Sequence, residues 1–160
     1  MERVNRILQH NRYHGCLQEI QRLEAGRIFC GHDMAHFMDV ARLAYIFNLE
    51  EGLGISKELI YASALLHDVG RHLQYLEGTP HEKAGLPLAR EILQDCGFTE
   101  AEQRMVLGAI SSHRDRTVRG EASLRGILYR ADKMSRACYG CMAEKECDWS
   151  PQKKNLRIEY

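Results

Sequence analysis

The chain has 160 residues, of which 44% are hydrophobic, and this size and composition suit one globular domain with an apolar core. Its 22 basic and 22 acidic residues balance, which argues against a general nucleic-acid binder and against attachment to an anionic membrane. No apolar run approaches the ~20 residues of a membrane span, and residues 1–6 lack the apolar stretch of a secretion signal. We therefore expect a cytoplasmic protein with no membrane partner.

Helical periodicity runs through most of the chain, and only three prolines interrupt it. Two short helices are predicted at the N-terminus, over 2–9 and 16–25. A longer helix is expected over 33–49, with Asp33 as its N-terminal cap. The next helix is expected over 56–70, with a serine cap at its start and a glycine at its end.

Further along the chain, Thr79 is expected to cap a helix that closes at Gly97. A second Thr-x-x-Glu capping box predicts a helix over 99–112. Residues 114–120 are charged and predicted to be flexible, and a last helix is predicted over 122–138. The predicted fold is all-α.

We expect one helical domain over 1–160, with no linker or internal repeat. Within it we distinguish N-terminal helices (1–29), a central core (30–137) and a cysteine-containing tail (138–160).

The first chemical signal is a His67-Asp68 pair directly after the apolar residues 64–66. Adjacent helix residues point about 100° apart, so two adjacent ligands for one ion require a helix end, where an ion can sit beyond the last turn. Imidazole and carboxylate together suit a divalent Mn, Fe, Co, Ni or Zn ion. An isolated His-Asp pair, however, more often consists of a surface histidine and a solvated aspartate.

Three segments of the chain together form a larger pattern: His-Phe-Met-Asp-Val at 36–40, His-Asp-Val-Gly at 67–70 and Ala-Asp-Lys-Met at 131–134. This order resembles the HD-domain superfamily of metal-dependent phosphohydrolases, whose signature is a histidine, a His-Asp pair and a distant aspartate on separate helices. The resemblance extends over about 30–137. It implies an HD-type helical bundle and four metal ligands, namely His36, His67, Asp68 and Asp132.

Two more histidines, His81 and His113, fall between the His-Asp pair and the last aspartate. Dinuclear members of the superfamily have two extra histidine ligands in this order. The resemblance thus implies one or two ions, with Asp68 shared between them. The alternative is that both histidines line a mononuclear pocket and contact a phosphate group.

The resemblance also implies a phosphate-binding residue after the His-Asp pair. Many members have lysine there, whereas this chain has Arg71, whose guanidinium keeps the charge and offers two parallel donors. Arg71 could instead be only a cation at a helix C-terminus. Lys133 and Arg114 are further phosphate-binding candidates, and His32 is a candidate for the pocket lining.

Three tail cysteines, Cys138, Cys141 and Cys147, form a Cys-x2-Cys-x5-Cys pattern. Thiolates at this spacing can hold a soft metal, as zinc or an iron–sulfur cluster, if Cys30 supplies the fourth ligand. The alternative is that these are free thiols, because the four-ligand motif is incomplete within the tail.

The function implied is hydrolysis of a nucleotide or small phosphate ester by metal-activated water, with Asp68 and Arg71 as catalytic residues and a small phosphorylated substrate as the partner. One alternative is a di-iron oxygenase that uses all six ligands. Another is a non-catalytic nucleotide-sensing module. Association into a homo-oligomer is compatible with each of these functions.

Overall fold

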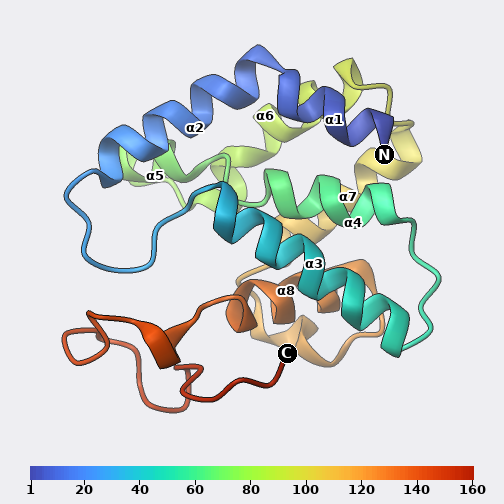
Figure 1. Cartoon of the computed structure of the whole chain (residues 1–160). Coiled ribbons are helices and arrows are strands. Elements are labelled where there is room, and N and C mark those ends of the chain that lie inside the picture. Colours follow the sequence, from blue (N-terminus) through green and yellow to red (C-terminus); the bar gives the residue numbers. More distant parts are fainter.

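The computed structural model describes all 160 residues, and every regular element in it is helical, as the sequence predicts (Figure 1). The α-helices are α1 (Glu2–Gln9), α2 (Asn11–Glu24), α3 (Met34–Glu50), α4 (Lys57–Leu66), α5 (Arg71–Glu77), α6 (His81–Asp95), α7 (Glu100–Ser112) and α8 (Leu124–Met134). Two 3-10 turns, η1 (Arg116–Gly120) and η2 (Cys138–Gly140), flank α8. None of the helices combines the length and apolarity that crossing a membrane requires.

Helix α4 is the central element of the bundle, because it contacts α1, α3, α6, α7 and α8. Its apolar residues surround the whole helix, and all of its residues from Ala62 to Leu66 are buried. A helix that is apolar on every side is stable only inside a protein. Because α4 is central, the residue that follows it, His67, lies in the interior of the molecule.

Two of the predicted caps are confirmed by their hydrogen bonds. The Asp33 side chain accepts from the backbone N–H of His36 at 2.9 Å and starts α3. Thr99 and Glu102 form the reciprocal capping box that starts α7. The first of these caps fixes the orientation of the helical turn that carries His36.

The N-terminal boundaries differ from the prediction at two helices. Helix α2 begins at Asn11 rather than at residue 16, because the imidazole of His10 accepts from the backbone N–H of Arg12 and caps the helix. Gly15 does not break it. Helix α6 has Pro80, not Thr79, at its N-cap position, and no side chain caps it.

Three further predictions were wrong in the middle and C-terminal parts of the chain. Helix α4 ends at Leu66 instead of near Gly70, and the unpredicted helix α5 follows it. Helix α5 has seven residues and none of them is buried, so its sequence lacks the apolar period that reveals a helix. Residues 114–120 were expected to be flexible but contain η1, and the last helix ends at Met134 rather than at residue 138.

The turn that follows α4 packs backbone against backbone on α6. A Cβ atom added at Gly70 would lie 2.4 Å from the backbone nitrogen of Gly85 and 2.5 Å from the carbonyl oxygen of His81. Neither backbone atom can move without shifting α6. Glycine is thus required at position 70 by the close approach of the two segments, although its φ of −78° suits any residue.

We expect Gly70→Ala to lower the free energy of unfolding by about 1–3 kcal/mol, the usual cost of forcing extra atoms into a packed region. Gly15→Ala is the control, since nothing lies within 4 Å of its added Cβ on helix α2. Urea denaturation of both variants measures the difference. Equal stability of Gly70→Ala and the unmodified protein would contradict this account of the turn.

Candidate metal centre

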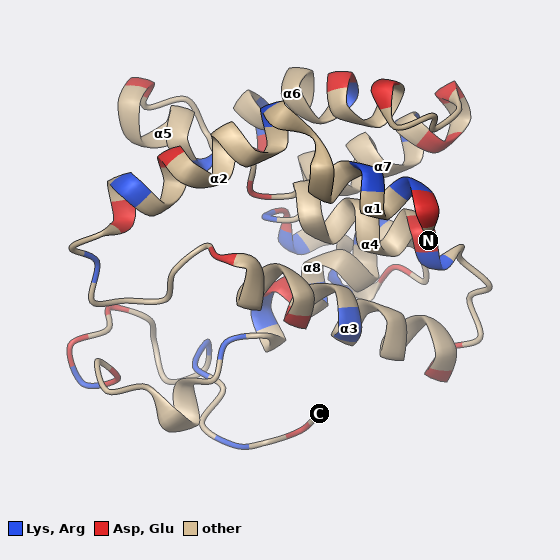
Figure 2. Cartoon of the chain, turned by 45° about the horizontal axis from the view of Figure 1, so that its top comes forward, with Lys and Arg blue, Asp and Glu red and all other residues tan.

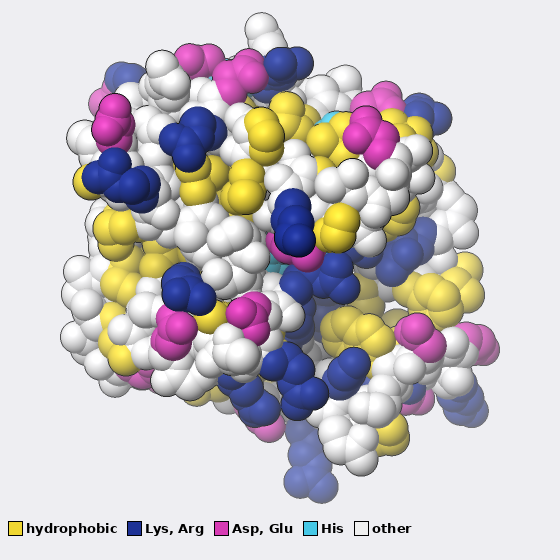
Figure 3. Space-filling view, turned by 180° about the vertical axis from the view of Figure 1, so that it is seen from behind, with side chains coloured by type: hydrophobic (Ala, Val, Ile, Leu, Met, Phe, Trp, Pro, Cys, Tyr) yellow, Lys and Arg dark blue, Asp and Glu magenta, His cyan; other side chains and the backbone are white.

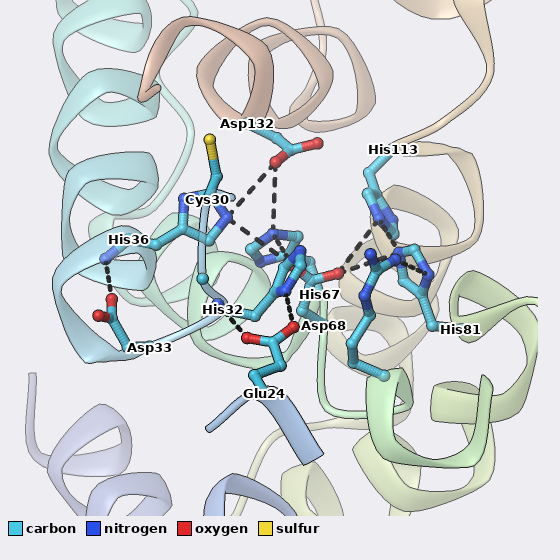
Figure 4. A network of polar contacts seen from close by, with 12 residues as sticks. Glu24, Cys30, His32, Asp33, His36, His67, Asp68, His81, His113 and Asp132 are labelled. Carbon is cyan, nitrogen blue, oxygen red and sulfur yellow. Dashed lines mark hydrogen bonds and ion pairs between the residues drawn. The ribbon is translucent and has the colours of Figure 1, made fainter. Parts of the chain in front are cut away.

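Six buried side chains from five separate parts of the bundle meet in its interior (Figure 4). His36 lies in the first turn of α3, the His67-Asp68 pair directly follows α4, and Asp132 lies in the last turn of α8. His81 begins α6, and His113 follows α7. Their potential ligand atoms form two groups, each with all members within 4.8 Å of one another: His36, His67 and Asp132 in the first, and Asp68, His81 and His113 in the second.

Asp68 faces both groups with different oxygens. Its Oδ2 lies 3.1 Å from Nε2 of His67 and 3.7 Å from Nε2 of His36. Its Oδ1 lies 3.0 Å from Nε2 of His81 and 3.8 Å from Nε2 of His113. This is the position of a carboxylate that can serve two ions, one on each side.

The four histidines of these groups share one orientation, with Nδ1 beside an acceptor and Nε2 directed inward. A ring whose Nδ1–H donates to a fixed oxygen keeps the lone pair of Nε2 available for a metal. The Nδ1 acceptors are Ser135 Oγ for His36 (3.2 Å), the Ala64 carbonyl for His67 (2.7 Å), Gln74 Oε1 for His81 (2.5 Å) and the Ile110 carbonyl for His113 (2.6 Å).

Three inward nitrogens show why this arrangement fits a cation. Nε2 of His67 is buried and has no hydrogen-bond partner. Nε2 of His81 lies only 2.9 Å from Nε2 of His113, so two lone pairs face each other. Buried polar atoms are rarely left unpartnered, and one positive ion in each group would satisfy these atoms.

Burial and the two carboxylates determine which side chains of the metal centre are charged. Burial disfavours a charged His67 imidazolium, but the adjacent Asp68 and Asp132 outweigh it and raise the pKa of His67 to about 10, so a metal ion that binds Nε2 must displace its proton. Burial opposes ionisation of both carboxyls as well, yet the neighbouring His67 and His36 keep the pKa of each well below its usual value. The two aspartates therefore stay negatively charged and attract a cation.

His32 lies beside this cluster but is not among the side chains that line the adjoining cavity. Its Nε2 is 3.9 Å from Oδ2 of Asp68, and its Nδ1 is paired with the carboxylate of Glu24. Burial is the main cause that lowers the pKa of His32. Glu24 also accepts from the backbone N–H of His32 at 2.9 Å and from the hydroxyl of Tyr75, so this carboxylate fixes the ring.

Arg71 reaches the second group from the start of α5. It is therefore at a helix N-terminus, and the alternative of a C-terminal helix cation is wrong. Its Nη1 lies 3.0 Å from Nδ1 of His81, and its Nε donates to the Tyr75 hydroxyl at 3.2 Å. Arg114 is farther from the cluster, because it pairs at 3.5 Å with Glu82, whose carboxylate is 3.9 Å from His81.

Two cations border the first group. Lys133 pairs with Asp132 at 2.5 Å. Arg136, which the sequence analysis did not single out, has its Nη2 3.0 Å from Nε2 of His36, and its Nη1 donates to the carbonyl of Gly31 at 2.7 Å. Arg136 lies two residues beyond the end of α8, so no helical spacing from Asp132 marks it in the sequence.

An open cavity of about 320 Å³ adjoins the first group. His36 and Arg136 line it together with Ile28, Phe29 and the backbone near Gly31. In the view from behind the molecule, lysine and arginine side chains gather around a hollow with histidine visible at its floor (Figure 3). The four cysteines singled out in the sequence lie around a separate, smaller cavity.

Comparison with known proteins agrees with this geometry. Residues 34–137 match the HD domain family, so the chain belongs to that family, whose members bind divalent metal ions. The chain is 44% identical, over the full length of both proteins, to an uncharacterized protein of Clostridium beijerinckii (strain ATCC 51743 / NCIMB 8052). It also resembles the crystal structure of a predicted HD superfamily hydrolase from an uncultured Thermotogales bacterium, with a TM-score of 0.61 and 25% identity over 89% of this chain and 81% of that one.

Proposed function

We propose that this protein is a metal-dependent phosphohydrolase that acts on a nucleotide or another small phosphate ester. The observation that carries the proposal is the cluster of inward-facing Nε2 atoms and carboxylate oxygens, with cationic side chains beside it. We assign one divalent Mn, Fe, Co, Ni or Zn ion to His36, His67, Asp68 and Asp132. A second ion is assigned to Asp68, His81 and His113.

A divalent ion held by these residues would supply Lewis acidity toward a phosphoryl oxygen and would lower the pKa of a bound water toward about 7. The surrounding side chains orient and neutralise the phosphate. Because Nδ1 of His81 donates to Gln74, it cannot also accept from Arg71, and the Arg71 guanidinium keeps Nη donors for an anion. Arg136 and Lys133 provide further positive charge on the opposite side of the cluster.

The cavity beside His36 has the size of a small-molecule site, for which about 300 Å³ is the usual lower limit. Its apolar side chains, Ile28 and Phe29, suit a flat organic group such as a nucleobase. Arg136 lies between this cavity and the metal centre. This arrangement fits a substrate whose organic part lies in the cavity and whose phosphate group lies at the metal centre.

A di-iron oxygenase is the second candidate, because Asp68 faces both three-residue groups as a shared ligand would. The cations favour the phosphohydrolase, since dioxygen and a neutral substrate give arginine no anion to bind. A nucleotide-sensing module would use the same cations without turnover.

The deciding experiment is metal reconstitution followed by two assays. The purified protein is stripped of metal, loaded with each of the five ions, and tested for phosphate release across nucleotides and sugar phosphates. We expect release with at least one ion and none without metal. Oxygen consumption by a protein with two irons, with no phosphate release, would replace the proposal by the oxygenase. Tight nucleotide binding without either activity would replace it by the sensing module.

Arg71→Ala is expected to separate substrate handling from metal binding. Loss of one charge-assisted contact to phosphate should lower kcat/KM by about 10- to 100-fold, or about 1.5–3 kcal/mol, while the metal content stays unchanged. Arg42→Ala is the matched control, because Arg42 is exposed on α3 and its ion pair is with the exposed Asp39. Full activity of Arg71→Ala on every substrate would show that Arg71 does not bind the phosphate.

A further inference from the structure

Four cysteines that are distant in the sequence line one small cavity, here called the cysteine cavity: Cys30, Cys138, Cys141 and Cys147. The first comes from the loop between α2 and α3, and the others belong to η2 and the tail after it. Figures 1 and 2 both show this loop beside the tail at one edge of the bundle. All four are free thiols, and no disulfide joins any two of them.

We propose that the cysteine cavity binds one structural zinc ion through its four thiolates, separately from the histidine–aspartate centre. Nothing in the metal-dependent hydrolysis proposed above requires this ion.

The number of the thiols and their spacing in the sequence favour zinc. Structural zinc sites are closed and tetrahedral, and four cysteines with a Cys-x2-Cys pair are one of their common ligand sets. Cys138 and Cys141 form this pair across η2, where the backbone N–H of Cys141 donates to the carbonyl of Cys138 at 3.2 Å. The other two ligands come from separate segments, so one ion would join three stretches of chain.

The size of the cysteine cavity distinguishes one ion from a cluster. Its volume is about 20 Å³, close to the ~10–15 Å³ that a single water-sized sphere requires. An iron–sulfur cluster contains several iron and sulfide ions and would need far more space. Phe29, Trp149 and the Glu144–Lys154 ion pair complete the wall, and the Lys154 side chain is only 9% exposed.

Few other interactions stabilise the conformation of the tail. After α8 it contains no α-helix, only η2, and its hydrogen bonds to the bundle come mainly from Asn155, which donates to the carbonyls of Lys133 and Arg136 at 2.8 and 2.9 Å. Lys154 donates to the backbone carbonyl of Glu144 at 2.7 Å within the tail itself. Short segments without a sufficient core are commonly stabilised by a metal ion, because its binding free energy adds to folding.

The cysteine cavity adjoins the larger cavity of the candidate active site. Cys30 and Cys141 line both, and Cys30 lies two residues before His32. Arg136, which contacts His36, also holds the backbone at Gly31. A zinc ion here would therefore fix one wall of the substrate cavity and keep the loop that carries His32 in place.

The test uses the full chain with the histidine–aspartate centre disabled by Asp68→Ala, so that the two metal sites are counted separately. Zinc is measured by mass spectrometry after expression with zinc and dialysis. We expect about one zinc per chain in Asp68→Ala and less than one-tenth of that when Cys141→Ser is added. Replacing the buried Cys96, which lies outside the cysteine cavity, by serine in the same background is the control and should leave the zinc in place.

Cobalt provides a second measurement that does not depend on how well the cysteine variants fold. Cobalt-loaded Asp68→Ala should show the intense visible absorption of a tetrahedral Co²⁺–thiolate site, and zinc should displace it. Removing zinc with a chelator should also make the tail at Lys145 and Lys153 sensitive to trypsin. Absence of the thiolate absorption, zinc content unaffected by Cys141→Ser, or a brown protein with acid-labile sulfide would each overturn the proposal.

Discussion

Replacing Asp68 by alanine should abolish metal-dependent phosphate release, with a loss of at least about 1,000-fold in kcat, which corresponds to about 4 kcal/mol. Asp68 is the only side chain that faces both three-residue groups, since its two oxygens lie 3.1 Å from His67 and 3.0 Å from His81. Without it the first ion loses one of four ligands, and the second keeps only His81 and His113. The variant should therefore lose metal as well as activity.

The same substitution should change how metal affects stability. A ligand that binds only the folded state stabilises it by about 2.7 kcal/mol at a concentration 100 times its Kd. Manganese or zinc should thus raise the Tm of the unmodified protein and raise that of Asp68→Ala much less. Asp95→Ala is the control, because Asp95 is exposed at the end of α6 and pairs only with His10. If Asp68→Ala retains more than one-tenth of the activity, the metal-centre assignment is wrong.

The residues that converge in the structure could be predicted because each lies in a recognisable local context. His67 and Asp68 follow an apolar helix, and Asp33 marks the start of the helix that carries His36. The resemblance also implied the division into two groups, with His81 and His113 beside a shared Asp68. That division depends on the rotation of Asp68 and on the positions of α6 and α7, which long-range packing determines.

The supporting residues could not be predicted in the same way. Glu24 comes from the end of α2 and meets His32 only because the chain folds back over the loop between α2 and α3. Gln74, which accepts from Nδ1 of His81, lies on α5, a helix without an apolar period. Such contacts join elements whose relative placement no local spacing encodes. Arg136 belongs with them, because it lies beyond the end of α8 and reaches His36 on α3.

The number of ions is the largest remaining difference between the functional alternatives, and His113→Ala should decide it. His113 lies in the second group only, and its Nδ1–H is held by the carbonyl of Ile110. With two ions, this variant should drop from about two ions per chain to about one. Its kcat should fall by about 100-fold or more, since the second ion no longer helps to hold the phosphate.

A mononuclear pocket gives a different result for the same variant. His113 would then only contact the substrate, so the metal content of His113→Ala would equal that of the unmodified protein, and the loss would appear mainly in KM. His14→Ala on the exposed face of α2 controls for the removal of a histidine as such. His113 is only 1% exposed, so removing its ring leaves a buried space into which the surrounding side chains can collapse. His113→Gln therefore accompanies it: this variant fills the space but lacks the inward imidazole nitrogen, and a two-ion centre requires that it lose one ion as well.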